Sequence, residues 1–239
     1  MSYTIIIIAN YLYRTWANVI FTSQKRTGAV FLAVFALGGC SALPDKPTRA
    51  TVYDFGPGAV ALQPASRQAS SPVLPALPVL PTLPTLALDE VQAGAALDST
   101  AVLYRLAYAD AQALRPYAQA RWSMTPAQLL RQRLREHLGQ RRAVLNAADG
   151  SASTAPILLR IELEEFSQLF ETPSISTGLL RLRATALQPS SQGERLLGQR
   201  SFTVQRPSPS ADATGGVRAL TAASDAAIEE IDLWLQQLR

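Results

Sequence analysis

The only cysteine of the chain, Cys40, marks the boundary between a predicted signal and the residues that can take part in the fold. Lys25 and Arg26 precede a run of uncharged, mostly apolar residues, 29–37, and two glycines then lead to the cysteine. A basic start, a short apolar segment and a cleavage site of small residues are typical of a secretory signal, which is removed from the mature protein. The sequence therefore predicts a signal peptide over residues 1–39 and a folded chain that begins after it.

The four residues Leu37-Gly38-Gly39-Cys40 resemble the bacterial lipobox. This resemblance implies cleavage between Gly39 and Cys40, transfer of a diacylglycerol to the Cys40 thiol and acylation of the new amine. No cofactor is expected beyond this covalent lipid. The alternative is an ordinary signal or membrane anchor with an incidental cysteine, which would leave an exported chain with an unpaired, oxidisable thiol. By resemblance to Gram-negative lipoprotein sorting, Ser41 favours the periplasmic face of the outer membrane.

Removal of the predicted signal changes the charge of the chain. Residues 1–39 hold Arg14, Lys25 and Arg26 and no acid, so losing these three positive charges lowers the net charge from +4 to +1. A nearly neutral mature chain gives no indication of nucleic-acid binding. Residues 1–24 contain no uninterrupted apolar stretch of the ~18 residues that span a membrane. They indicate either a misassigned start codon or a long n-region.

After the signal, we expect a lipidated tether over residues 40–50 and a single domain over 51–239. Within the domain, residues 64–87 are expected to be an insertion rich in proline and leucine, which recur with a period of three: prolines at 72, 75, 78, 81 and 84, and leucines at 74, 77, 80, 83 and 86. Polyproline II has three residues per turn, so this period places prolines along one edge and leucines along another. Such a segment is either a stiff apolar rod that docks on a partner or a low-complexity linker.

Alternation of apolar and polar residues predicts the strands, which fall at 51–55, 86–92, 101–108, 157–166, 174–187 and 194–205. A helix is predicted from Pro126, because Thr125 is a suitable N-cap and Gln128 completes a capping box. A second helix is predicted over 212–238. Adjacent strands and few helices favour an α+β fold, with an antiparallel-rich sheet and both main helices packed on one face.

This arrangement predicts which side chains are buried and which meet water. The helix residues expected in the core of the sheet–helix interface are Leu130, Leu134, Ile231 and Trp234. On the exposed face of the sheet, we expect Glu162 and Glu164 to lie opposite Arg181 and Arg183, as cross-strand ion pairs.

The side chains available for catalysis are few. His137 is the single histidine and Cys40 is used for lipidation, so no second histidine or cysteine can share a metal ion. The sequence contains no Gly-x-Ser-x-Gly, Ser-x-x-Lys or phosphate-binding glycine motif. Glu164 and Glu165 are adjacent in a predicted strand, where neighbouring side chains point to opposite faces. We therefore predict neither an enzyme nor a metal site.

A connection between a strand and the first helix, 110–123, is the predicted partner-binding segment. It carries Arg115, Tyr117, Arg121 and Trp122, and arginine and aromatic side chains dominate binding hot spots. For Trp122 an alternative is favoured, in which the indole covers the core beneath the helix start. Arg115, Tyr117 and Arg121 are predicted to contact a partner.

Three stretches of the chain resemble the ABC-type transport auxiliary lipoprotein family, which includes the paraquat-inducible protein C lipoproteins. They are the run Tyr53-Asp54-Phe55-Gly56-Pro57, the segment from Val102-Leu103-Tyr104-Arg105 through Arg115-Pro116-Tyr117 and Arg121-Trp122-Ser123 to Leu130, and the closing Ile231-Asp232-Leu233-Trp234-Leu235. The proline- and leucine-rich run departs from the pattern of the family and resembles an insertion.

The resemblance implies a non-catalytic subunit of an MCE-type ABC system, which moves lipids between the two membranes of a diderm bacterium. Its expected partners are the MCE-domain substrate-binding protein and, through the lipid anchor, the membrane; homo-oligomerisation is left open. Two alternatives are a lipoprotein scaffold or activator of a cell-wall synthase, which would need a long flexible tether, and a lipid-carrying chaperone, which would need a large internal apolar cavity.

Overall fold

Nine strands and two helices make up the part of the chain that the computed structural model describes, residues 49–58, 83–150 and 154–238. In chain order they are β1 (Thr51–Tyr53), β2 (Leu86–Leu88), β3 (Gln92–Ala93), β4 (Ala101–Leu106), β5 (Asp110–Trp122), α2 (Pro126–Gly139), β6 (Val144–Asn146), β7 (Ile157–Phe170), β8 (Ser176–Ser190), β9 (Gly193–Pro207) and α3 (Ala213–Gln237). The predicted signal, Cys40 and most of the proline- and leucine-rich run lie outside the described residues.

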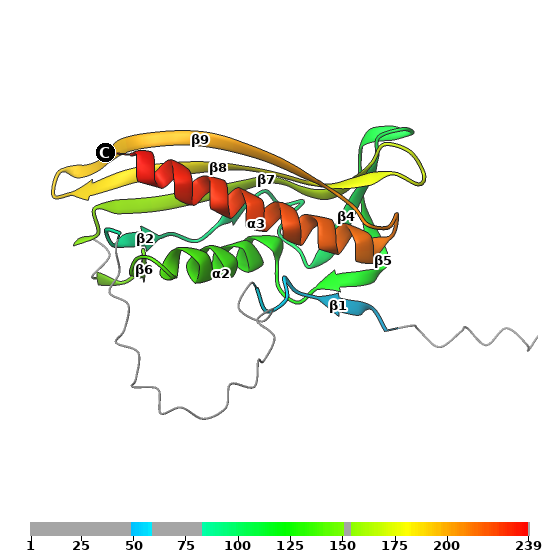
Figure 1. The fold of residues 1–239 in the computed structure, drawn as a ribbon, viewed down its shortest axis with the longest axis horizontal. Coiled ribbons are helices and arrows are strands. Elements are labelled where there is room, and N and C mark those ends of the chain that lie inside the picture. Colours follow the sequence, from blue (N-terminus) through cyan, green and yellow to red (C-terminus); the bar gives the residue numbers. More distant parts are fainter. Residues whose placement is uncertain (1–48, 59–82, 151–153, 239) are drawn as a thin grey trace, which may run out of the picture. The chain divides into compact units, whose positions relative to one another are not determined.

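The nine strands form one mixed sheet with β7 at its centre (Figure 1). Along one edge β7 pairs with β8 in the antiparallel sense, and β9 pairs with β8 in the same way. Along its other edge β7 pairs in the parallel sense with β2, β3 and β4 in succession. Strand β6 extends the sheet beyond β2, while β5 and then β1 extend it beyond β4. The predicted α+β class is confirmed.

Both predicted helices are present, and the side chains at their first turns explain where they begin. The Thr125 hydroxyl accepts the Gln128 N–H at 3.4 Å, and the Gln128 side chain accepts the Thr125 N–H at 3.1 Å, so the predicted capping box forms. Helix α3 begins after Asp212, whose carboxylate accepts the Gly215 N–H at 2.7 Å. This bond and one from Ser210 lower the pKa of Asp212. Local capping therefore fixes the start of each helix.

The two helices lie side by side on one face of the sheet, as predicted (Figure 1). Leu130, Leu134 and Ile231 are fully buried, Trp234 is 7% exposed, and all four belong to one hydrophobic cluster with β7, β8 and β9. Because the apolar faces of both helices pack against the same face of the sheet, these side chains form a continuous core.

Leu134→Ala is expected to lower the free energy of unfolding by ~2–5 kcal/mol, the usual effect of a large-to-small change in a packed core. Leu134 has no exposed surface, so the change removes buried methyl groups and leaves a cavity. Urea denaturation measures the effect. Leu233→Ala on α3 is the matched control, because Leu233 is 60% exposed and its truncation should change stability by about 0.5 kcal/mol or less. Equal midpoints for the two variants would contradict the assignment.

Helix α3 packs closely against Gly178 on β8. A Cβ atom at this position would lie 2.6 Å from backbone atoms of Ala219 and Leu220. Only glycine fits there without moving the helix away from the sheet.

Gly178→Ala is therefore expected to destabilise the protein by about 1–3 kcal/mol, the usual effect of overpacking. Thermal unfolding measures the change. Gly94→Ala is the control, because a Cβ atom at Gly94 meets nothing within 4 Å. A melting temperature for Gly178→Ala equal to that of Gly94→Ala would show that α3 does not pack against Gly178.

The opposite face of the β7–β8 pair carries the predicted ion pairs. Glu164 lies 3.1 Å from Arg181 and 2.7 Å from Arg183, and Glu162 lies 3.6 Å from Arg183. A register shift between Leu163 and Glu165 lets Glu164 contact both arginines. These side chains are partly to well exposed, so each pair is worth about 0–1 kcal/mol and the face is a solvated one.

Candidate functional site

The predicted partner-binding segment, 110–123, was expected as a connection between a strand and a helix, but nearly all of it is itself a strand. Residues 110–122 form β5, which pairs with β4 along much of its length and with β1 only at 120–122. Pro116 lies opposite Leu103 of β4, at a point where β1 does not reach. A proline lacks the N–H that an interior strand needs, but an edge position tolerates it.

Trp122 belongs to the core. Its side chain is 2% exposed, and its ring lies 5.7 Å from the rings of both Phe55 and Phe166. Because those two residues come from the segment after β1 and from β7, Trp122 joins three parts of the chain beneath the start of α2. Trp122 therefore covers the core beneath the start of the helix, which is the favoured alternative from the sequence. Its buried indole is not available to a partner.

Tyr117 is half-buried and takes part in a polar network. Its hydroxyl donates to the fully buried Gln168 at 2.8 Å, and the Gln168 amide donates to Ser176 at 2.8 Å. Its ring lies 4.6 Å from the ring of Tyr104. Burial, followed by the proximity of Tyr104 and Asp212, raises the pKa of Tyr117 above its ordinary range. The phenol therefore stays neutral and joins β5 to β7.

Arg121 and Arg115 differ in what their guanidinium groups do. Arg121 donates to the carbonyls of Tyr117 and Ala120, at 2.8 and 3.1 Å, and so binds its own strand. Arg115 is exposed, and its side chain makes no hydrogen bond or ion pair with the described residues. Arg115 is thus the exposed and unpaired charge among the four predicted residues. Trp122 is buried and does not share a surface with it.

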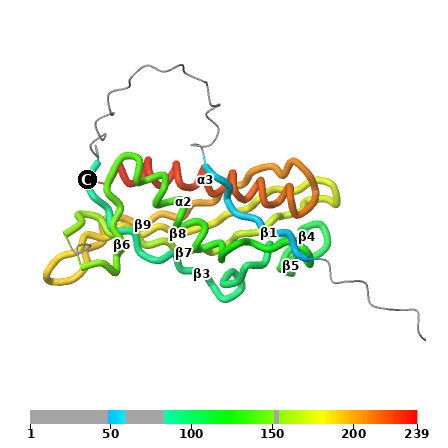
Figure 2. The backbone as a smooth tube through the Cα atoms, turned by 90° about the horizontal axis from the view of Figure 1, so that it is seen from below, coloured from blue at the N-terminus to red at the C-terminus, as the bar shows by residue number. Residues whose placement is uncertain are grey.

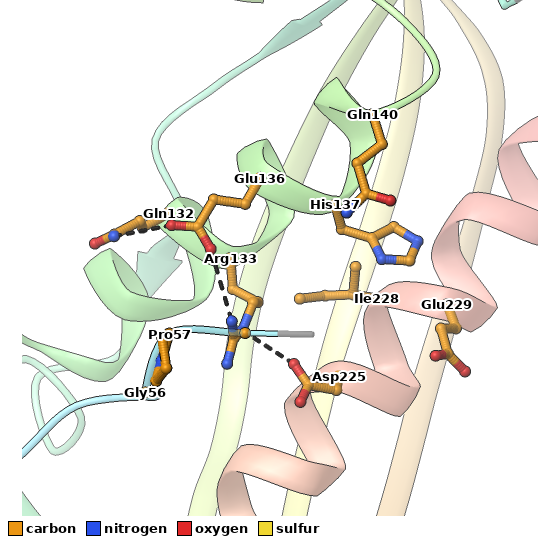
Figure 3. A pocket seen from close by; sticks show the side chains of 11 residues that line it. Gly56, Pro57, Gln132, Arg133, Glu136, His137, Gln140, Asp225, Ile228 and Glu229 are labelled. Atoms are coloured by element: carbon orange, nitrogen blue, oxygen red, sulfur yellow. Dashed lines mark hydrogen bonds and ion pairs between the residues drawn. The ribbon is translucent and has the colours of Figure 1, made fainter. Parts of the chain in front are cut away.

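A groove between the two helices is a second candidate site, which the sequence interpretation missed (Figure 3). Its volume is about 520 Å³, and it is lined by Gly56, Pro57, Gly58, Gln132, Arg133, Glu136, His137, Gln140, Asp225, Ile228 and Glu229. We call it the helix groove. It opens between α2, α3 and the turn that follows β1.

Arg133 organises the helix groove. It is 8% exposed and donates to the Phe55 carbonyl, which ties α2 to the segment after β1. Its guanidinium also lies 3.0 Å from Asp225 on α3 and 3.6 Å from Glu136, and Figure 3 shows its side chain pointing at these carboxylates. Burial raises the pKa of Asp225, an effect that Arg133 opposes and Glu229 adds to.

The chemistry of the helix groove follows from its charges. The lining carries three carboxylates, those of Glu136, Asp225 and Glu229, and one buried arginine, so its charged groups have an excess of acid. This excess of acid favours cationic groups. Within the described residues, no group of three or more His, Cys, Asp or Glu side chains is arranged to hold a metal ion. His137 lines the groove wall.

Glu164 and Glu165, the adjacent carboxylates of β7, are separately neutralised. Glu164 contacts Arg181 and Arg183 on the exposed face. Glu165 is 7% exposed and forms a two-point ion pair with Arg105, at 2.9 and 3.3 Å. Arg105 also donates to the carbonyls of two β5 residues, so Glu165 serves to hold β5 and β4 against β7.

These features define an α+β sandwich with a filled core, a solvated sheet face and an open groove between its helices. A family model described as ABC-type transport auxiliary lipoprotein component matches residues 62–232, more than half of the 239-residue chain. The chain therefore belongs to this family of ABC-transport auxiliary lipoproteins, which confirms the resemblance found in the sequence.

Comparison with solved structures supports the fold. Protein XCC0632 from Xanthomonas campestris, of family DUF330, is 24% identical, and the match covers 66% of this chain and 87% of that one with a TM-score of 0.55. A crystal structure of an uncharacterized protein is 13% identical, with coverage of 64% and 92% and a TM-score of 0.50. No curated protein matches the chain. At these identities the likeness shows a common fold.

The described residues contain no segment suited to crossing a bilayer as a helix. Helix α3 is the longest, at 25 residues, yet neither it nor α2 is apolar enough over a sufficient length.

Proposed function

We propose that this chain is a non-catalytic auxiliary component of an MCE-type ABC system that transports lipids between inner and outer membranes. In this proposal Cys40 carries a diacylglycerol and an N-acyl lipid and holds the domain at the periplasmic face of the outer membrane. The domain binds the MCE-domain substrate-binding protein of the transporter. The observation that carries the proposal is membership of the auxiliary lipoprotein family across residues 62–232.

The filled core argues against the lipid-carrying chaperone. A carrier needs an enclosed apolar cavity, because an acyl chain must be removed from water. The space between the sheet and the helices is instead occupied by side chains without exposed surface, among them Leu134, Leu180 and Ile231. The helix groove is open and carries four charged side chains, so it is not an enclosed apolar cavity.

The short distance along the chain from Cys40 to β1 argues against the cell-wall synthase activator. Ten residues separate Cys40 from Thr51, and at 3.3–3.6 Å per residue they extend at most about 40 Å. An activator of a synthase in the inner membrane would have to cross most of the periplasm on such a tether. An auxiliary component fits better, because it only needs to hold the far end of a conduit close to the outer membrane.

We propose Arg115 as part of the surface that contacts the MCE-domain protein. Its guanidinium is exposed on β5 and makes no hydrogen bond or ion pair with the described residues, so the fold has no evident need for its charge. Arginine is among the residues enriched at binding hot spots. Tyr117 and Arg121 follow it on β5, but both also bond to this domain, so truncating either would disturb the fold as well.

Arg115→Glu is therefore expected to weaken binding to the MCE-domain protein encoded nearest to this gene on the order of tenfold, about 1.4 kcal/mol. Thermal stability should stay unchanged, because the side chain is exposed. Titration of the purified MCE-domain protein against the full-length lipoprotein in detergent measures the effect. Arg195→Glu on β9 gives the same charge change near the β8–β9 turn and should leave affinity unaltered.

Three results would decide the matter. Loss of affinity in Arg115→Glu alone supports both the partner and the surface. Equal affinity in both variants moves the contact away from β5. Failure of the wild-type lipoprotein to bind the MCE-domain protein at all would refute the proposed partner.

A further inference from the structure

Two large apolar side chains stand exposed on neighbouring turns of the sheet. Tyr108 lies in the turn between β4 and β5 and is 49% exposed, and Ile175 ends the turn between β7 and β8 and is 56% exposed. The turns are adjacent, because the Ala107 N–H donates to the Phe170 carbonyl at 2.8 Å. The two side chains therefore lie on one end of the domain.

The fold does not account for either side chain. Ile175 closes its turn through the backbone, by donating to the Thr172 hydroxyl at 3.0 Å and accepting from the Glu171 N–H at 3.0 Å. A small polar residue could make the same bonds. Tyr108 makes no hydrogen bond or ring contact with the described residues. Tyrosine and isoleucine are unusual in turns, where polar residues dominate, and these two lie exposed on adjacent turns.

The start of the described chain lies at this same end. In Figures 1 and 2, β1 and the β4–β5 and β7–β8 turns are all found at one end of the long axis, opposite the β8–β9 turn and the C-terminus. Nine residue-to-residue steps join Cys40 to Arg49, which limits their separation to about 32 Å at 3.3–3.6 Å per step. Strand β9 has 15 residues and is about 50 Å long at 3.3 Å per residue, so the β8–β9 turn lies about that far from this end.

We propose that this end of the domain, which we call the turn end, contacts the bilayer that holds Cys40, with Tyr108 and Ile175 entering the headgroup region. The proposal rests on the lipidation of Cys40 in the proposed function. Tyrosine is enriched at membrane interfaces, where its ring is shielded and its hydroxyl stays hydrated, and an aliphatic side chain gains by leaving water there. Two such contacts are weak alone, but the anchor supplies a high effective concentration of bilayer.

The contact would fix the orientation of the domain. With the turn end on the membrane, the long axis stands away from it, and the β8–β9 turn and the C-terminal end of α3 point into the periplasm. Lipid then covers the tips of the two turns, and the rest of the domain stays outside the bilayer.

Environment-sensitive labelling tests the proposal on the full-length protein. Lipidation uses the only native thiol, so Tyr108→Cys and Ile175→Cys each introduce a single site for an NBD fluorophore. Leu196→Cys is the matched control, because Leu196 is 59% exposed and lies on β9 near the β8–β9 turn. Each labelled protein is reconstituted into vesicles of phosphatidylethanolamine and phosphatidylglycerol that contain a doxyl-lipid quencher, and flotation is measured in parallel.

The expected result is a blue shift and quenching at 108 and 175, with neither at 196. Flotation of all three proteins without quenching at 108 and 175 would overturn the contact and leave the anchor intact. Equal quenching at all three sites would show that the domain lies flat, and would also overturn the proposed orientation. A protein that does not float, or a wild type that takes up the label at Cys40, would refute the lipid anchor and the contact together.

Discussion

Replacement of Cys40 by serine is expected to abolish lipid attachment and release the protein from the membrane. The chain has no other thiol that could accept a diacylglycerol. Each buried methylene of an acyl chain contributes about 0.8 kcal/mol, and one chain alone gives only reversible binding, so two or three chains on one residue are needed for stable anchoring. Palmitate labelling and membrane fractionation of wild type and Cys40→Ser measure the two effects.

Ser41→Asp is the matched control for Cys40→Ser. It leaves the acceptor thiol in place and changes only the residue that the sorting resemblance singles out. We expect normal palmitate labelling with retention at the inner membrane. Labelling of Cys40→Ser equal to wild type would refute lipidation at this residue, and labelling without a change of membrane for Ser41→Asp would refute the sorting argument alone.

The features that were predicted correctly from the sequence depend on residues or strands that are close together along the chain. Thr125, Pro126 and Gln128 contain all that is needed to start α2, and the capping box formed as expected. Strands β7, β8 and β9 have long alternating patterns, and two turns connect them in succession, so their pairing followed from order alone. The ion pairs of Glu162 and Glu164 were found for the same reason.

The features that could not be predicted from the sequence depend on pairing between strands that lie far apart in the chain. Strand β6 has three residues, too few to show a period, and it forms because Val144 lies next to Leu86 of β2, which in turn pairs with Ile157 of β7. The segment expected as one strand over 86–92 is divided into β2 and β3, with Asp89 accepting from Arg160 between them. No local pattern encodes parallel contacts between segments so far apart in the chain.

The helix groove was missed although α2 carried one signal for it. Arg133 lies between Leu130 and Leu134 in the apolar stripe, whereas the other charged residues of α2 fit a solvated face. A charged residue is almost never fully buried unless it is paired. Its position alone thus required a partner, but identifying Asp225 on α3 and the Phe55 carbonyl required the tertiary structure.

The buried ion pair between Arg142 and Asp232 joins the segment after α2 to α3. Arg142 is 3% exposed and donates to Asp232 at 2.7 Å, and Asp232, 7% exposed, also accepts from Gln236 at 3.1 Å. Burial lowers the pKa of Arg142, while the charge of Asp232 raises it. Removing one partner of such a pair leaves an uncompensated charge in a site with little water, which usually costs about 3–5 kcal/mol.

Asp232→Ala is therefore expected to lower the free energy of unfolding by ~3–5 kcal/mol in urea denaturation. Arg141, whose guanidinium lies 3.6 Å from Asp232 and is half exposed, can turn to solvent and should add little to this loss.

Two further variants separate the buried charge from simple loss of contact. Glu194→Ala breaks the ion pair with Arg160, where both side chains are about 40% exposed, and should cost about 1 kcal/mol or less. Asp232→Leu combined with Arg142→Met replaces the pair by apolar groups and should recover most of the stability lost in Asp232→Ala, since no charge remains buried. A double variant no more stable than Asp232→Ala would contradict this explanation. The loss would then come from packing at this end of α3, and the charge of Arg142 would have no part in it.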